Sequence, residues 1–201
     1  DDKEAASQVV TAARSRLNML DAGVSIIEES MMATEAFLKA RSGWNAVINA
    51  DAAIREATAL AEEMSKENIL ASQAKGNEAL AFLEEAQQDF SQAEAAYPSL
   101  DLAAFKAYVA KRIESQQAAL AADEAYLSRN KEELEAQNSR YNALEEEAAA
   151  LAQKLGEDDP EQIVALRFYE EIEADQGAYE AERLKAGNAD AFLREYLGTA
   201  S

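Results

Sequence analysis

Four polar side chains recur every seven residues in one stretch of the chain, and they are the first candidates for binding chemistry. They are Gln116, Asp123, Asn130 and Gln137. Each lies three residues after an apolar residue, and these apolar residues also recur every seven residues. One long helix would therefore align the four polar side chains as a polar seam. Such a seam could line a wet groove, set the register of a partner helix or bind a ligand. The alternative, which we favour, is a helix that buries only a narrow apolar stripe there.

Aromatic side chains near the C-terminus form a second candidate surface. They are Phe168, Tyr169, Tyr179, Phe192 and Tyr196. Aromatic residues near the ends of a bundle usually fill the core where helices splay, but outward-facing tyrosine hydroxyls could also form a recognition surface. A similar aromatic group flanks Pro98, and the nearby cations Lys106, Lys111 and Arg112 are expected to pair with acidic side chains of the same chain.

The composition excludes much chemistry. The 201 residues include no His and no Cys, and 19 Lys and Arg stand against 39 Asp and Glu, a net charge of −20. These absences rule out a Ser-His-Asp triad, a thiol nucleophile, a Cys zinc site and the Glu-x-x-His motif of di-iron bundles. The negative charge opposes binding to nucleic acid. We expect no enzyme, no metal, no cofactor and no nucleic-acid partner, with the acidic clusters lying on solvated helix faces.

Apolar spacing predicts an all-α protein. In the N-terminal third, apolar or small residues follow one another at steps of three and four, which indicates the buried seam of a bundle helix: Val10, Ala13, Leu17, Leu20, Val24, Ile27, Met31, Thr34 and Leu38. Beyond Leu38 the stripe changes phase. We expect the helix to break or kink at Ser42–Gly43, with a seam-rotating stutter as the alternative, and to break again at Gly76.

The longest predicted helix runs from residue 101 to 155, about 80 Å at 1.5 Å per residue. Pro98 precedes it, and the stretch from Gly156 to Pro160 ends it with a glycine cap, an Asp159 N-cap and a proline at the first helical position. A shorter helix should follow and break at Gly187–Asn188. Residues 1–201 are thus predicted to form one domain, an elongated antiparallel bundle or coiled-coil-like rod with three or four long helices and one or two short C-terminal helices.

Residues 78–131 carry a resemblance to a known family. Their sequence is EALAFLEEAQQDFSQAEAAYPSLDLAAFKAYVAKRIESQQAALAADEAYLSRNK. A helix that ends at a proline turn, followed by a long helix with tyrosines at intervals, resembles the cell-wall-binding helical lipoproteins of Gram-positive bacteria. This resemblance implies a lipid-anchored bundle at the cell envelope, with its anchoring Cys upstream of Asp1. It assigns no functional residue.

The leading hypothesis is a non-enzymatic, extracytoplasmic spacer or protein-interaction module at the bacterial cell envelope, an expectation that the Met-less start also favours. One alternative is a ligand-binding bundle that uses the polar seam or the C-terminal aromatic residues. Another is a cytoplasmic coiled-coil subunit of a larger assembly. A protein or cell-wall partner is expected, with no transmembrane segment in this chain, a lipid anchor upstream, and a monomeric or weakly oligomeric state.

Overall fold

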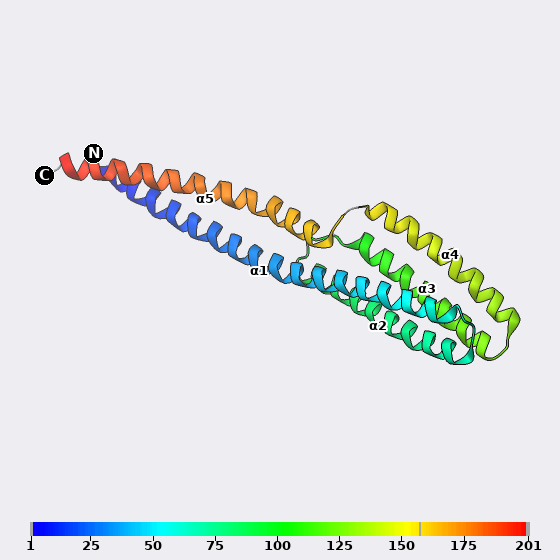
Figure 1. The fold of residues 1–201 in the computed structure, drawn as a ribbon. Helices are drawn as coiled ribbons and strands as arrows, with labels where there is room; N and C mark the ends of the chain where they lie inside the picture. Colours follow the sequence, from blue (N-terminus) through cyan, green and yellow to red (C-terminus); the bar gives the residue numbers. More distant parts are fainter. Residues whose placement is uncertain (1, 157, 200–201) are drawn as a thin grey trace. The chain divides into compact units, whose positions relative to one another are not determined.

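A computed structural model describes residues 2–156 and 158–199. These residues form five helices and no strand, which confirms the predicted all-α class (Figure 1). The helices are α1 (Asp2–Ala61), α2 (Lys66–Ala96), α3 (Ala103–Leu127), α4 (Lys131–Leu155) and α5 (Pro160–Thr199). Among the described residues, no helix combines the length and the hydropathy that a membrane span requires.

Side-chain caps fix where several helices begin. The Ser65 hydroxyl accepts a hydrogen bond of 3.1 Å from the Asn68 amide at the start of α2, and the Asn130 side chain accepts one of 3.2 Å from the Glu133 amide at the start of α4. Asp159 accepts one of 2.8 Å from the Glu161 amide, directly before the predicted proline start of α5. Each cap satisfies a backbone donor that has no partner within the helix.

The chain divides into two compact units, one made of residues up to Thr34 and from Ala165 onward, the other of Glu35–Val164. The first unit contains only the beginning of α1 and most of α5, which run antiparallel. Arg16 binds Asp190 at 2.7 Å, the Ser25 hydroxyl donates to Asp175, and Tyr196 donates to Asp2. Each helix in this unit therefore has one helical neighbour. The single-domain prediction for residues 1–201 stays a prediction.

The second unit is a bundle of four helices: the end of α1 with α2, α3 and α4 (Figure 1). Its largest buried side chains are aromatic and meet near the turn between α2 and α3. Phe105 packs edge-on against Trp44 with ring centroids 5.6 Å apart, and against Phe90 at 5.8 Å. Tyr97, beside the Pro98 turn, is also buried. These rings fill the core, as aromatics near helix ends usually do.

The predicted seam of α1 is wrong. All nine of its residues, from Val10 to Leu38, are exposed to solvent. The buried line runs along the opposite side of the helix, with steps of three and four from residue 33 to residue 50. Its fully buried members are almost all small: Ala5, Ala12, Ser15, Ala33, Ala36, Ala40, Gly43, Val47, Ala50 and Ala57. Small side chains let two helix backbones approach closely, so they can form the contact surface in place of larger apolar residues.

The predicted helix breaks at Ser42–Gly43, Gly76 and Gly187–Asn188 are also wrong, because α1, α2 and α5 continue through these positions. The first two glycines are sites of close packing. A Cβ on Gly43 would lie 2.9 Å from Phe90 Cε1, and one on Gly76 would lie 2.6 Å from Gln116 Nε2. The buried line of α1 continues at steps of three and four through Gly43. The change of phase in the sequence arises because the predicted seam follows the exposed stripe before Gly43, whereas the apolar residues after Gly43 belong to the buried line.

The single long helix expected from residue 101 to 155 is instead a hairpin of α3 and α4. Ser128 ends α3, Arg129 takes a left-handed conformation with φ of 58°, and Asn130 caps α4. The separate short C-terminal helices are likewise one continuous α5. Apolar residues recur every seven residues on both sides of the Arg129 turn, and both helices present apolar faces to the same bundle.

Candidate functional site

A small polar cavity of about 170 Å³ lies between the end of α1 and the helices α2, α3 and α4 of the second unit. Its walls combine methyl groups with hydroxyl, amide and carboxyl groups. They comprise Ile54, Ala57, Thr58 and Ala61 of α1, Ser72 of α2, Gln116, Ala119, Ala122 and Asp123 of α3, and Asn138 and Tyr141 of α4. Two of the four predicted seam residues, Gln116 and Asp123, therefore line one cavity.

Asp123 is the ionisable acid of this cavity. Its Oδ2 atom accepts a hydrogen bond of 3.1 Å from the Ser72 hydroxyl of α2. Burial raises the pKa of the Asp123 carboxyl above its usual value, and the Ser72 hydrogen bond opposes this shift. No Lys or Arg of the described chain lies within ion-pair distance of Asp123. The carboxylate is thus partly desolvated without a cation to balance it.

Gln116 is more deeply buried, with 4% of its surface exposed. Its amide nitrogen packs against the bare backbone of Gly76, in the space that any other side chain on α2 would fill. Among the residues that the structure describes, the Gln116 amide has no hydrogen-bond partner. Neither amide atom of Gln116 is among the fully buried side-chain atoms that lack a partner, so the amide keeps access to the cavity that it lines.

The other two predicted seam residues lie elsewhere. Asn130 caps α4, and the Gln137 amide donates to Glu133 at 2.7 Å on the same helix. The α3–α4 turn separates these two residues from Gln116 and Asp123, so the four never form one line. Sequence spacing missed the cavity residues from other helices, namely Ser72, Thr58, Asn138 and Tyr141, because no local signal shows which helix faces which.

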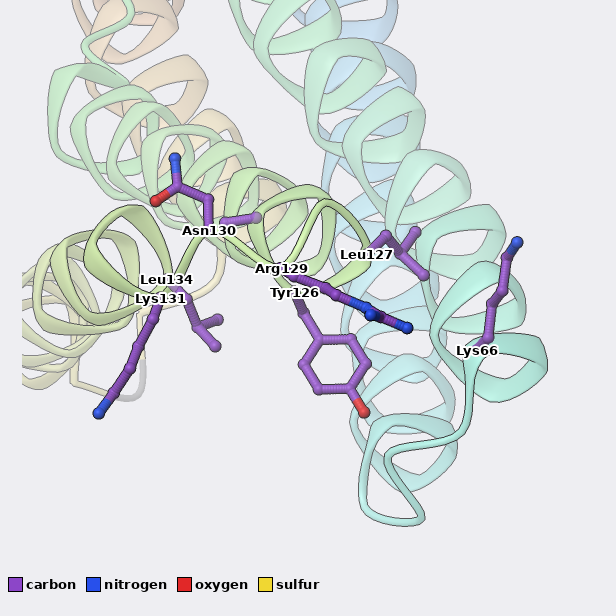
Figure 2. A pocket seen from close by; sticks show the side chains of 8 residues that line it. Lys66, Tyr126, Leu127, Arg129, Asn130, Lys131 and Leu134 are labelled. Atoms are coloured by element: carbon purple, nitrogen blue, oxygen red, sulfur yellow. The ribbon is translucent and has the colours of Figure 1, made fainter.

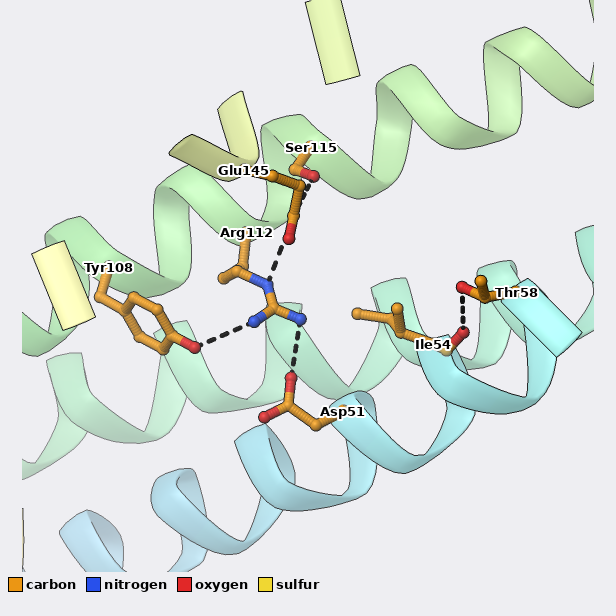
Figure 3. A network of polar contacts seen from close by, with 7 residues as sticks. All are labelled: Asp51, Ile54, Thr58, Tyr108, Arg112, Ser115 and Glu145. Atoms are coloured by element: carbon orange, nitrogen blue, oxygen red, sulfur yellow. Dashed lines mark hydrogen bonds and ion pairs between the residues drawn. The ribbon is translucent and has the colours of Figure 1, made fainter. Parts of the chain in front are cut away.

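A polar network of the second unit centres on Arg112 (Figure 3). Arg112 donates to Asp51 of α1 at 2.7 Å and to the Tyr108 hydroxyl at 3.0 Å, and its Nε lies 3.9 Å from Glu145 of α4. Ser115 donates to the same Glu145 carboxylate. Burial is the main cause of the raised pKa of the Tyr108 hydroxyl. The network joins three helices, and it confirms that Arg112 pairs within the chain.

The other two cations near Pro98 also pair within the chain. Lys106 binds Glu94 at 2.7 Å, and Lys111 binds both Glu114 and Glu147 at 3.0 Å. This pairing was expected from the excess of acidic residues.

A larger cavity of about 460 Å³ lies where α2 begins and α3 turns into α4 (Figure 2). Lys66, Arg129 and Lys131 contribute cations to its rim. Figure 2 shows Lys131 pointing away from Lys66 and Arg129, so the three charges do not converge on one ligand position. Lys131 also lies 3.6 Å from Glu135.

The predicted aromatic surface is divided along α5. Phe168 and Tyr169 have ring centroids 5.7 Å apart, and Phe192 and Tyr196 stack at 6.5 Å. The two pairs are 24 residues apart on one helix, about 36 Å at 1.5 Å per residue. Tyr179 lies between them in sequence. These five residues therefore do not form one compact cluster.

The first unit carries an exposed apolar stripe that no helix of that unit covers. We call it the α1 apolar face and define it by residues that are each at least half exposed: Val10, Leu17, Leu20, Val24, Ile27 and Met31. The face lies opposite the small-residue line that contacts α5. An uninterrupted apolar stripe on a helix surface is typical of a surface that binds another protein.

No family model, curated protein or solved structure matches this chain. Within the described residues, no group of three or more acidic side chains is placed to hold a metal ion.

Proposed function

We propose that this protein is a non-enzymatic protein-interaction module that binds a helical partner through the α1 apolar face. The observation that carries this proposal is the exposure of six large apolar residues with coiled-coil spacing, from Val10 to Met31. In a coiled coil, residues at these positions insert between the side chains of a facing helix. Within the first unit, α5 packs on the other side of α1, so this face is open to such a helix.

Charges beside the face favour a partner of particular chemistry. Arg14 flanks its N-terminal part, whereas Asp21 and Glu28 flank its C-terminal part. A partner helix with acidic residues at one end of its apolar stripe and basic residues at the other would match both ends. Such flanking charges select the partner and its orientation more than they add affinity.

Site-specific photo-crosslinking tests this function in cells that produce the protein naturally. A photoreactive residue at Leu20, on the α1 apolar face, should give a covalent adduct with a discrete protein. The matched control places the same residue at Thr11, an exposed position on another side of α1. Equal yields from the two positions, or no adduct from either, would contradict the proposal.

The partner's chemistry needs a second experiment. A synthetic amphipathic helix with a Leu and Ile stripe, basic at one end and acidic at the other, should bind the wild-type protein. The double variant Leu20→Glu, Ile27→Glu should bind it at least tenfold more weakly. Equal affinity for both proteins would show that this face is not the binding surface.

A location at the bacterial cell envelope is part of this proposal, and its support is the resemblance of residues 78–131. The gene sequence upstream of Asp1 tests it directly. A signal peptide that ends in a lipid-modified Cys would support the envelope location, and an initiator Met without such a segment would contradict it.

A further inference from the structure

We propose that the cavity beside Asp123 binds a small organic ammonium ion, with the charged nitrogen at the carboxylate and a short alkyl chain along the methyl-lined wall. This site lies in the second unit and is independent of the α1 apolar face. With this small-molecule site, the protein would be a ligand-binding bundle as well as a protein-interaction module.

Gln116 is the first observation that points to a ligand. Only 4% of the surface of this residue is exposed, it lines the cavity, and it has no hydrogen-bond partner among the described residues. Its amide atoms are not among the fully buried ones that lack a partner, so they reach the space of the cavity. A ligand with N–H or O–H groups in the cavity would supply a hydrogen-bond partner.

Asp123 decides the charge of the ligand. Its carboxylate has one hydrogen bond, from Ser72, and no cation within ion-pair distance in the described part of the chain. The cations Lys75 and Arg112 already bind other carboxylates. A desolvated carboxylate attracts a cation, and the net charge of −20 repels anionic ligands from the molecule as a whole.

The size and lining of the cavity define the rest of the ligand. A volume of about 170 Å³ equals the share of roughly six water molecules at about 30 Å³ each. This volume accommodates a chain of about five to eight non-hydrogen atoms. The methyl groups of Ala57, Ala119 and Ala122 provide an apolar wall, whereas a calcium ion requires six to eight oxygen ligands.

Nuclear magnetic resonance titration with n-butylammonium chloride tests the proposal on the wild-type protein, at constant ionic strength. We expect saturable shifts of the backbone amides of Thr58, Ser72 and Asn138, which come from three different helices. The neutral analogue 1-butanol and the anion butyrate should bind at least tenfold more weakly. Shifts that do not saturate, or that spread evenly over the acidic surface, would overturn the proposal.

Matched variants then test the residues. Asp123→Asn keeps the shape and a hydrogen-bonding group for Ser72, and should lower n-butylammonium affinity at least tenfold. Glu124→Gln removes the same charge from the exposed next residue of α3 and should change the affinity less than twofold. Gln116→Met should weaken binding at least threefold.

Equal losses in Asp123→Asn and Glu124→Gln would show that only general charge attraction operates, and would overturn the site. Equal affinity for n-butylammonium and 1-butanol would show that the cavity is a hydrated void with no preference for a cation. The wild-type titration reports on the site even where a variant does not fold.

Discussion

Arg112 of α3 donates to Asp51 of α1 across 2.7 Å, and this contact ties together two helices that are 61 residues apart in sequence. The guanidinium of Arg112 is largely buried, with 13% of its side chain exposed, and it also contacts Tyr108 and approaches Glu145. A buried cation with two acidic partners from different helices fixes how those helices align.

Replacing Arg112 with Met should therefore destabilise the bundle. Removing one partner leaves the carboxylates of Asp51 and Glu145 without their cation, and we expect the free energy of unfolding to fall by about 2–4 kcal/mol. Urea denaturation measures the change. The matched control Arg140→Met alters an exposed arginine of α4 and should change stability by less than about 0.5 kcal/mol. Equal effects of the two variants would contradict the role of Arg112.

Two glycines of α1 provide a paired test of the buried line. Gly43→Ala places a Cβ 2.9 Å from the Phe90 ring and 3.2 Å from the Ala86 carbonyl oxygen, and should destabilise the protein by about 1–3 kcal/mol. Gly23→Ala meets no atom within 4 Å and should stabilise it by about 0.5–1 kcal/mol, because alanine favours the helix. Thermal unfolding of both variants measures these opposite signs, and a stabilising Gly43→Ala would contradict the close packing.

The exposure of the α1 apolar face predicts unusual tolerance to polar substitution. Leu20→Gln and Ile27→Gln should each change the free energy of unfolding by less than about 0.5 kcal/mol, because both side chains are already in water. Leu83→Ala, at a position with no exposed surface, should cost about 2–5 kcal/mol. Chemical denaturation separates the two cases. A loss above about 2 kcal/mol in Leu20→Gln would mean that the face is buried in the free protein.

Asp123 predicts a dependence of stability on pH. Because burial raises the pKa of its carboxyl in the folded state, the folded protein holds this proton more tightly than the unfolded chain does. The resulting stabilisation is complete below the unfolded pKa, about 3.9, and is lost as the pH rises through the folded value. Asp123→Asn should therefore raise the melting temperature at pH 7, by a few degrees at most because the carboxyl is half-buried.

Circular dichroism at pH 7 and below pH 4 measures this effect. The difference between Asp123→Asn and the wild type should shrink at the lower pH, where Asp123 is protonated in both states. The variant Glu124→Gln, on the exposed side of α3, should show a smaller difference at pH 7. A lower melting temperature of Asp123→Asn at pH 7 would show that the ionised carboxylate stabilises the fold.

Two residues of the candidate site, Gln116 and Asp123, could be predicted from sequence. The seven-residue spacing of Gln116 and Asp123 is two turns of one helix, and such a local relationship survives in α3. Asn130 and Gln137 continued the same spacing, but the turn at Arg129 separates them from the other two. Ser72 and Tyr141 come from other helices, and their position beside Asp123 depends on contacts between helices.

The sequence by itself determined the helical class, the proline turn at Pro98 and the helix end near Gly156, because these depend on backbone preferences of a few adjacent residues. It also indicated that the cations near Pro98 pair within an acidic chain. Only the tertiary structure decided which side of α1 is buried and whether Gly43 and Gly76 interrupt their helices. Two stripes run along α1, and the contact with neighbouring helices selects the small-residue stripe because it allows the closer approach. The larger apolar residues therefore remain exposed, where they form the surface on which the proposed function depends.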